Sequence, residues 1–312
     1  MAWKVLVTDG LEAIGKQIIN LNNIVVDKKG IEAEELLSVI GEADALIVRG
    51  RTKVTADVIK AGKNLKVVGR MGVGVDNIDL KAAKENNVMV VNAATATSEA
   101  VAELAMGMIF ALARELPRAD ATMKADVWAK KEFEGIELMG KTLGVLGYGN
   151  IGRLTGKYAA CMGMSVIAYD PYRDDDYMHA NGAKKVSLDE LYAQSDFITI
   201  HMPLTGETKH MVCDDSFGKM KDGVRIVDAA RGGVIDEVCL LAALESGKVA
   251  GVALDVYEKE PPTDWKLVHH PKVIATPHIG AQTKEAQLRV AHDIAEEVLR
   301  ALDGQELRWR IV

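Results

Sequence analysis

Three segments near the end of the 312-residue chain place ionisable side chains directly after runs that are typical of β-strands. Arg231 follows the first run, Asp255 and Glu260 follow the second, and His278 follows the third. In open α/β sheets, ligands bind at the carboxyl ends of the strands. The pattern therefore predicts a site where a guanidinium, a carboxylate and an imidazole meet, which suits the binding of an anion and the transfer of a proton.

Each of these side chains also has a simpler interpretation. His278 could be a hydrogen-bonded core histidine, and Glu260 could lie in a solvated turn before two prolines. Arg231 could bind the last carbonyls of a helix. A position at the end of a strand, with charged partners at the ends of other strands, favours catalysis over these alternatives.

A glycine motif lies between a strand candidate at 143–146 and a helix candidate at 151–161. It consists of Gly147, Gly149, Asn150, Ile151 and Gly152, with a tyrosine after the first glycine. In this context, the glycines allow a tight turn, the close approach of a pyrophosphate and close packing of helix on strand. The helix N-terminus adds free N–H groups and partial positive charge. The motif predicts a dinucleotide site, although glycines that serve packing alone are the alternative.

Asp170 ends the next strand candidate, at 165–169, eighteen residues after the last glycine of the motif. A carboxylate at this position accepts hydrogen bonds from both ribose hydroxyls and repels a 2′-phosphate. The spacing therefore favours NAD over NADP, although Arg173 nearby leaves some use of NADP open.

Short β-branched runs alternate with helix-like segments along the chain, which is typical of an α/β fold with parallel sheets. At roughly 150 residues per domain, the length predicts two domains. A long apolar helix at 99–115 stands between two series of strands, and an amphipathic helix at 284–302 lies near the end. The strand candidates are 4–7, 24–26, 45–48, 66–68 and 88–91 in the first series, and 143–146, 165–169, 197–200, 224–227, 251–254 and 273–275 in the second.

Composition excludes several classes of function. The net charge is −7 and no basic run offsets it, which argues against nucleic acid or an acidic membrane as partner. No stretch approaches the ~18 apolar residues of a membrane span, and no export signal is apparent. The three cysteines are far apart and the histidines lack ligand spacing, so we expect no disulfide, no metal and a reducing cytoplasm.

Four ordered motifs, at 147–152, 230–233, 255–262 and 277–280, resemble the signatures of the D-isomer-specific 2-hydroxyacid dehydrogenases. The resemblance covers nearly the whole chain. Within this family, the segments 47–59 and 69–77 are most similar to the D-3-phosphoglycerate dehydrogenases. Because the four motifs occur together and in the order of the family, they argue against the simpler interpretations of the single residues.

The resemblance implies a doubly wound Rossmann-type NAD domain inserted in a flavodoxin-like substrate domain. We expect the substrate domain at 1–95 and 284–312 and the NAD domain at 96–283. The family also implies a homodimer formed through the NAD domain, with the apolar helix and the segment after it at the interface. The C-terminal regulatory domain of longer phosphoglycerate dehydrogenases is absent, so we expect no serine feedback through such a module.

The family's reaction, hydride transfer between NAD and a 2-hydroxy acid, assigns roles to the ionisable residues. His278 would exchange the hydroxyl proton, and Glu260 would bind His278 and stabilise its imidazolium. Arg231 would bind the substrate carboxylate. Asp255 would orient the nicotinamide carboxamide. Further expected contacts are the backbone of Val73 and Gly74 to the substrate carboxylate, and Ala229 and Gly280 to the cofactor.

The implied substrate is 3-phosphoglycerate, oxidised to 3-phosphooxypyruvate in the first step of serine biosynthesis. Arg49 and Arg51 match positions that bind the phosphoryl group, and Lys130 would reach the same group across the dimer interface; the alternative for the two arginines is a solvated basic turn. Three departures concern the substrate: Asp228 replaces the family's usual asparagine, Val73 replaces a small polar residue, and the loop 92–98 lacks the family's proline and a later asparagine.

Two other functions stay open at this point. A sibling enzyme would act by the same chemistry on glycerate or hydroxypyruvate, glyoxylate or sulfolactate. A protein of another class with the same fold is an NAD-sensing corepressor that binds peptides. That protein would carry long disordered tails, which this sequence does not show.

Overall fold

The computed structural model describes residues 2–312, and the chain forms two compact units. One unit combines the chain up to Thr97 with Ala281–Val312, and the other is Ser98–Gly280. The second unit is therefore inserted into the first. The sequence led us to expect the crossings at 95 and 283.

The first unit is built on a parallel sheet of five strands in the order β2-β1-β3-β4-β5. This is the flavodoxin-like order. Each strand is short and rich in valine, isoleucine or leucine, as buried parallel strands are. The strands are β1 (Lys4–Val7), β2 (Ile24–Asp27), β3 (Ala45–Val48), β4 (Val67–Arg70) and β5 (Met89–Asn92).

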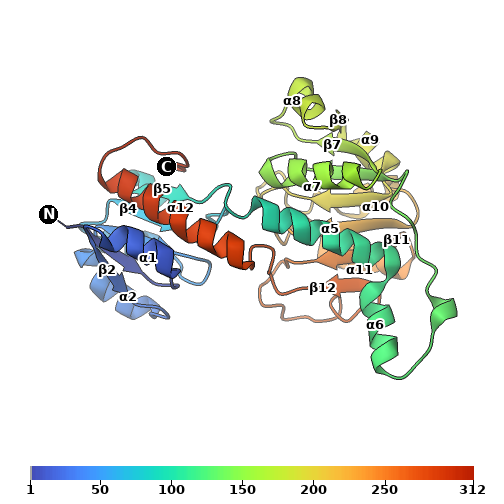
Figure 1. The fold of residues 1–312 in the computed structure, drawn as a ribbon, viewed down its shortest axis with the longest axis horizontal. Helices are drawn as coiled ribbons and strands as arrows, with labels where there is room; N and C mark the ends of the chain where they lie inside the picture. The colour runs from blue at the N-terminus through green and yellow to red at the C-terminus, as the bar shows by residue number, and fades with distance from the viewer. Residues whose placement is uncertain (1) are drawn as a thin grey trace. The chain divides into compact units, whose positions relative to one another are not determined.

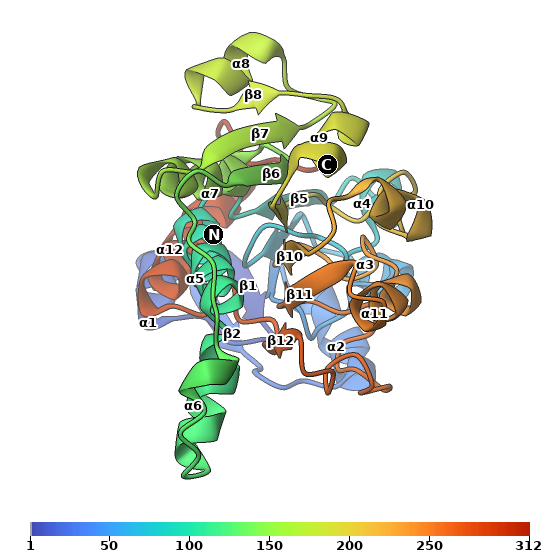
Figure 2. The same cartoon turned by 90° about the vertical axis from the view of Figure 1, so that its right-hand side faces the viewer.

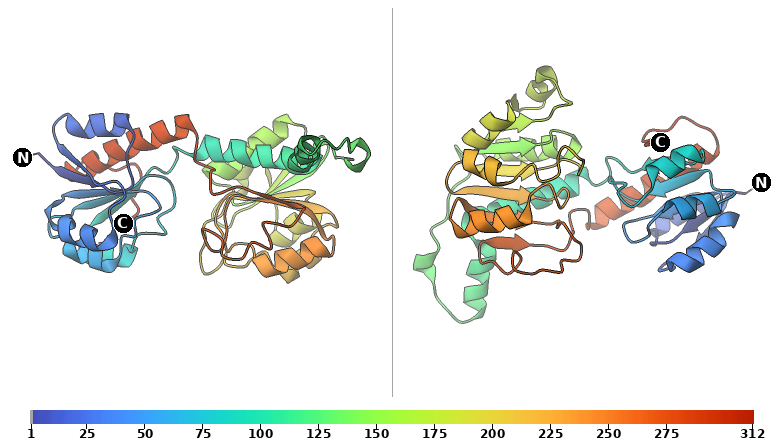
Figure 3. Two further views of the ribbon diagram at one scale, coloured as in Figure 1. Left: turned by 90° about the horizontal axis from the view of Figure 1, so that it is seen from below. Right: turned by 180° about the vertical axis from the view of Figure 1, so that it is seen from behind.

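Helices cover both faces of this sheet (Figure 1 and, from below, the left panel of Figure 3). The final helix α12 (Lys284–Leu302) packs beside α1 (Ala13–Asn20) over one face and contributes Val290, Ile294 and Val298 to the core. The close contact of α12 with the sheet requires Gly69 in β4, where a Cβ would lie 2.5 Å from Val298. The other face carries α2 (Ala33–Val39), η1 (Ile40–Glu42), α3 (Ala56–Ala61) and α4 (Leu80–Glu85).

The second unit has a parallel sheet of seven strands in the order β12-β11-β10-β9-β6-β7-β8, which Figure 2 shows nearly in sequence from β12 to β8. If β6–β12 are numbered 1–7 in chain order and the sheet is read from the β8 edge, the order is 3-2-1-4-5-6-7. This is the 3-2-1-4-5-6 order of a Rossmann fold with one strand added. The strands are β6 (Thr142–Leu146), β7 (Ser165–Tyr169), β8 (Lys184–Lys185), β9 (Phe197–Ile200), β10 (Val224–Asp228), β11 (Val249–Leu254) and β12 (Val273–Ala275).

Two sets of helices cover this second sheet. The long apolar α5 (Ser98–Arg114) packs against α7 (Asn150–Cys161), and the second set comprises α9 (Leu188–Gln194), α10 (Asp214–Lys219) and α11 (Glu237–Glu245). Beyond α5, the segment with α6 (Leu116–Lys124) and η2 (Lys130–Glu132) stands clear of the sheet (Figures 1 and 2). A last short helix, α8 (Asp175–Ala180), packs on β8. Within residues 2–312, no helix combines the length and the apolar character that crossing a membrane would need.

Candidate active site

The glycine motif forms the turn between β6 and α7 in the second unit. Gly147 has a φ of +88°, and a Cβ on Gly152 would lie 2.0 Å from the Gly147 carbonyl oxygen. These two positions therefore require glycine for the turn and for helix packing. Gly149 differs, because a Cβ there would meet no atom within 4 Å. Asn150 and Ile151 follow as the first residues of α7, so their backbone N–H groups lie at the helix N-terminus.

Asp170 lies at the carboxyl end of β7, beside this turn. One carboxylate oxygen accepts the Tyr148 backbone N–H at 2.8 Å, and the other accepts the Tyr172 N–H at 2.9 Å. The side chain thus fixes the glycine turn, and it keeps lone pairs for further donors. Arg173 is the residue that left some use of NADP open. Its guanidinium carbon lies 4.6 Å from the centre of the Tyr177 ring.

Asp228 ends β10 and begins the loop that carries Arg231. It is 2% exposed, and its carboxyl accepts backbone N–H groups of Ala230, at 2.9 Å, and Arg231. Burial raises the pKa of Asp228 to about 7, and the negative charge of Asp255 acts in the same direction. The two N–H donors and the Arg231 guanidinium limit the rise. The carboxyl therefore serves as an anchor for the start of the Arg231 loop.

Asp255 ends β11 and anchors the loop that carries His278. Its carboxylate is 1% exposed and accepts hydrogen bonds from the Thr276 hydroxyl at 2.6 Å, the Ile279 N–H at 2.8 Å and the Gly280 N–H at 2.7 Å. The sequence suggested a contact with cofactor for both Asp255 and Gly280. In the structure, they bind each other.

Glu260 and His278 form the closest charged pair of the site. Glu260 Oε2 lies 2.7 Å from His278 Nδ1, and Glu260 Oε1 accepts the Tyr257 N–H at 3.2 Å. Burial alone would raise the pKa of Glu260, but the hydrogen bond and charge of His278 lower it, with smaller contributions from Tyr257 and Arg231. With Nδ1 directed at Glu260, the Nε2 atom of the half-exposed imidazole is left for proton exchange.

The backbone of His278 is held in a sparsely populated conformation, with a φ of +53°. Such a conformation persists where surrounding contacts determine it. Thr276 and Tyr257 supply part of these contacts, since the Tyr257 hydroxyl donates to the carbonyl oxygens of Leu254 and Thr276. Sequence reasoning missed both residues, although Tyr257 lies inside the motif at 255–262 and Thr276 directly precedes the motif at 277–280.

In the first unit, Arg49 and Arg51 follow β3, as expected, but their side chains differ. The Arg51 guanidinium donates to the carbonyl oxygens of Thr8 and Ile31 and lies 3.3 Å from an Asp9 carboxylate oxygen. These contacts give Arg51 a structural role. Its side chain is 48% exposed, and its expected phosphate role stays a prediction. Within the described part of the chain, no carboxylate pairs with the Arg49 guanidinium. The Arg49 backbone is bound instead: its N–H donates to Asp9, and its carbonyl oxygen accepts the Asn77 side chain.

The expected carboxylate-binding backbone lies in the loop after β4. Val73 is exposed and Gly74 is half-exposed. Neither N–H donates to any acceptor within residues 2–312, whereas the Val73 carbonyl oxygen accepts the Asn92 side chain at 2.6 Å. Asn77 links this loop to the Arg49 loop by donating to the carbonyl oxygens of Arg49 and Thr52.

The remaining expected site residues lie in the second unit. Ala229 is buried immediately after Asp228. Lys130 is exposed in η2, on the segment that stands clear of the sheet. In the part of the chain that the structure describes, no cluster of three metal-ligating side chains occurs.

Comparison with known proteins identifies the family. A family model described as the D-isomer specific 2-hydroxyacid dehydrogenase, NAD binding domain, matches residues 106–280. The chain is also 47% identical to a hydroxypyruvate reductase of Thermotoga maritima over 96% of its own length and 98% of that protein. The chain belongs to the D-isomer-specific 2-hydroxyacid dehydrogenases. It is an NAD-dependent oxidoreductase of 2-hydroxy acids.

Other members of this family resemble the chain to a similar degree. It is 47% identical to the D-3-phosphoglycerate dehydrogenase of Methanocaldococcus jannaschii, over 97% of this chain but only 58% of that protein. Among solved structures, a glyoxylate reductase from Paecilomyes thermophila aligns with a TM-score of 0.92 and 31% identity over 99% of this chain and 98% of the other. Overall identity therefore does not select a substrate within the dehydrogenase family.

The residues of the glycine turn fit the family's cofactor NAD. The open space at Gly149, next to the first N–H groups of the twelve-residue α7, can admit a pyrophosphate. Asp170 at the end of β7 keeps acceptor capacity for ribose hydroxyls. The turn thus has the shape and the charge that the dehydrogenase fold uses for a dinucleotide.

Proposed function

We propose that His278, Glu260 and Arg231 carry out the proton transfer and substrate binding of this dehydrogenase. The observation that carries the proposal is the 2.7 Å contact between Glu260 and His278 at the carboxyl edge of the sheet. NAD supplies the acceptor for the hydride that leaves the substrate carbon. His278 takes the hydroxyl proton at Nε2 during oxidation and returns it during reduction.

Glu260 and Arg231 adapt the site to the charges that arise in this step. The Glu260 carboxylate stabilises the imidazolium when His278 holds the proton. The Arg231 guanidinium, whose Nη1 also donates to the Ala230 carbonyl oxygen at 2.6 Å, binds the substrate carboxylate by charge-assisted N–H bonds. Its loop is fixed by Asp228, and the His278 loop is fixed by Asp255, so both groups are held before substrate binds.

The substrate that we propose is 3-phosphoglycerate, oxidised to 3-phosphooxypyruvate. Support comes from Arg49, whose guanidinium suits a phosphoryl group and makes no ion pair with any carboxylate in residues 2–312. The N–H groups of Val73 and Gly74 would bind the substrate carboxylate from the same unit. Arg51 carries less of the proposal than Arg49, since Asp9 and two carbonyl oxygens bind its guanidinium.

A second candidate is a reductase of hydroxypyruvate or glyoxylate. One observation favours it specifically: Asp9 and two carbonyl oxygens bind the Arg51 guanidinium, so Arg49 is the one of the two arginines after β3 that makes no ion pair within residues 2–312. Moreover, a relative that is 47% identical to this chain is named a hydroxypyruvate reductase.

Steady-state kinetics, followed through NADH absorbance, distinguish the two candidates. For phosphoglycerate oxidation, kcat/KM should exceed that for D-glycerate by about a hundredfold or more, because a charge-assisted phosphate contact is worth roughly 1.5–3 kcal/mol and two or more N–H bonds form. The Arg49→Gln variant should lose most of this preference, and Lys53→Gln, two residues beyond Arg51 in the same loop, should keep it. Equal efficiency with both acids would refute the phosphate site and support the second candidate.

We also propose that two copies of the chain associate through an arm, defined here as residues 116–139. The helix α6 in this arm has no buried residue, and Trp128 and Met139 are 78% and 75% exposed. Large exposed apolar patches are rare on monomeric soluble proteins, and they mark surfaces that bind a partner. Their exposure favours burial against a second copy.

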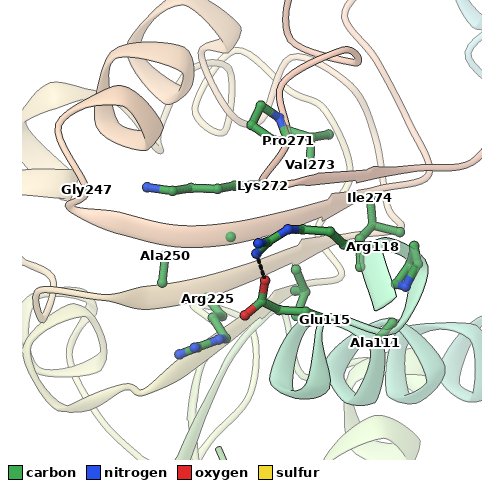
Figure 4. Close-up of a pocket in the computed structure, with 13 residues that line it drawn as sticks. Ala111, Glu115, Arg118, Arg225, Gly247, Ala250, Pro271, Lys272, Val273 and Ile274 are labelled. Atoms are coloured by element: carbon green, nitrogen blue, oxygen red, sulfur yellow. Dashed lines mark hydrogen bonds and ion pairs between the residues drawn. The ribbon is translucent and has the colours of Figure 1, made fainter. Parts of the chain in front are cut away.

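A cavity at the base of the arm supports this choice of partner (Figure 4). It has a volume of about 650 Å³ and lies between the α5–α6 junction and the strands β10–β12. Glu115 pairs with Arg118 inside it and also acts on Arg225 through its charge, while Lys272 Nζ donates to the Leu244 carbonyl oxygen at 3.1 Å. The arm carries the exposed acids Glu134 and Glu137, which complement these cations.

Light scattering after gel filtration tests the association. The wild-type chain should have the mass of two copies, and Trp128→Ser should shift the equilibrium toward one copy. Val238→Ser is the matched control, because Val238 is 81% exposed on α11, away from the arm. A wild-type mass of one chain at all concentrations would overturn the proposal.

A further inference from the structure

His210 lies outside the catalytic set but contacts the two loops that carry it. It belongs to the connection between β9 and α10. Its backbone N–H donates to the Gly233 carbonyl oxygen at 2.8 Å, two residues after Arg231. Its Nε2 lies 3.1 Å from a Glu258 carboxylate oxygen, two residues before Glu260, and its Nδ1 lies 3.4 Å from Asp236.

The backbone around His210 is held in a fixed conformation by local contacts. His210 has a φ of +52°, a conformation that is uncommon for residues other than glycine. The preceding turn is closed by the Thr208 hydroxyl, which donates to Pro203 at 2.6 Å and accepts the Thr205 N–H at 2.8 Å. After it, Val212 bonds to Val234, so the segment runs alongside the end of the Arg231 loop.

The two catalytic loops touch each other directly at this point. A Cβ on Gly232 would lie 1.8 Å from the Tyr257 carbonyl oxygen, so the backbone of the Arg231 loop rests on the backbone of the Glu260 loop. Glu258 and Glu237 also exchange hydrogen bonds, each carboxylate accepting the other's backbone N–H at 2.8–3.3 Å. Three carboxylates, those of Asp236, Glu237 and Glu258, therefore lie close together around one imidazole.

We infer that His210 is a positioning residue, which holds the Arg231 loop and the Glu260 loop in register by binding Gly233 and Glu258 at once. The inference rests on the proposed roles of Arg231, Glu260 and His278. The carboxylates that face the His210 ring are those of Asp236 and Glu258, with Glu237 bound to Glu258.

His210→Leu removes both ring contacts and is the primary test. We expect kcat to fall about tenfold or more, with less than a twofold change in KM for NAD, because displaced catalytic groups cost rate rather than cofactor affinity. The assay uses hydroxypyruvate with NADH and 3-phosphoglycerate with NAD, whichever the wild type turns over faster. Lys209→Ala, the neighbouring exposed residue, is the matched control and should keep wild-type rates.

The pH profile separates positioning from a general loss of structure. If Glu260 is less well placed, the His278 imidazolium is less stable, so the alkaline limb of the reduction rate should move to lower pH. A merely structural defect would lower activity at every pH and leave the limb unmoved, which would overturn the inference.

A second variant guards against misfolding of the first. Glu258→Gln breaks the same bridge from its other end, and the double variant should be no slower than the slower single variant if the two residues act through one contact. Additive losses would refute the bridge. His278→Gln in the same assay tests the proposed function separately: an active His278→Gln enzyme refutes that function, whereas an inactive one beside a normal His210→Leu enzyme refutes only the role of His210.

Discussion

Asp228→Asn should make the stability of the protein less dependent on pH. Asp228 is 2% exposed at the end of β10, and burial raises its pKa from 3.8 to about 7. In the unfolded chain, an aspartate ionises near its ordinary pKa of about 3.9. The folded protein therefore holds a proton that the unfolded chain has released over most of the range between these values.

The sign and the size of the effect follow from this difference. Because the folded pKa is the higher one, the contribution of Asp228 to stability is complete below pH ~4 and is lost as the pH rises toward 7. A pKa difference of about 3, at ~1.36 kcal/mol for each pKa unit, corresponds to about 4 kcal/mol in total. Between pH 5 and pH 8, the loss is about 3 kcal/mol. An asparagine cannot ionise, yet its oxygen still accepts the Ala230 N–H.

Urea unfolding at pH 5 and pH 8, monitored by circular dichroism, measures the effect as a difference between wild type and variant. We expect Asp228→Asn to gain about 3 kcal/mol relative to wild type on going from pH 5 to pH 8. The infrared band of a protonated carboxyl, present at pH 5 in wild type and missing in the variant, is an independent check. Parallel pH dependence of the two proteins, together with no such band, would refute the burial argument.

Four other substitutions test the candidate site. His278→Gln should lower kcat by roughly 10²–10⁴-fold and leave NAD affinity, measured by fluorescence titration, within twofold of wild type, since a proton-transfer group is lost and the nucleotide contacts stay; normal turnover would contradict its role. Asp170→Ala should weaken NAD binding about tenfold or more and narrow the preference over NADP, as charge-assisted bonds to the ribose disappear; an unchanged ratio of the two dissociation constants would remove Asp170 from the ribose site. Gly149→Ala should fold normally but lose NAD affinity, because the added methyl fills the open space that the pyrophosphate needs. Gly152→Ala should lower the melting temperature, because its Cβ would lie 2.0 Å from the Gly147 carbonyl oxygen. Equal melting temperatures for these two variants would contradict that distinction.

The fold could be predicted because the sequence repeats one local pattern. Buried parallel strands need short runs of branched apolar residues, and all eleven strand candidates are confirmed within a few residues, for example Ala45–Val48 and Phe197–Ile200. The strand that was missed is β8, which consists of Lys184 and Lys185. Charged residues are typical of an exposed edge strand, where no apolar pattern is required.

The candidate site could be predicted where the residue type itself indicates the chemistry, as for a histidine that exchanges a proton and a carboxylate that stabilises it. His278 and Glu260 lie 18 residues apart in sequence, and the structure brings them to 2.7 Å. The difference between Arg49 and Arg51 was not predictable, because it depends on Asp9 and on the Ile31 carbonyl, which come from other strand ends. The contacts of His210 likewise depend on long-range packing.

The acidic residues at the strand ends show why assigning one role to each is incomplete. A carboxylate offers about four lone-pair positions. Asp255 uses three of them on the His278 loop, and Asp170 uses two on Tyr148 and Tyr172. Each can therefore hold a loop and still bind a ligand group. It follows that alanine substitution at Asp170 removes both loop contacts together with a ribose contact. Asp170→Asn keeps one acceptor oxygen, for the Tyr148 N–H, and loses the acceptor for Tyr172, so it is the milder test of how charge contributes to the choice between NAD and NADP.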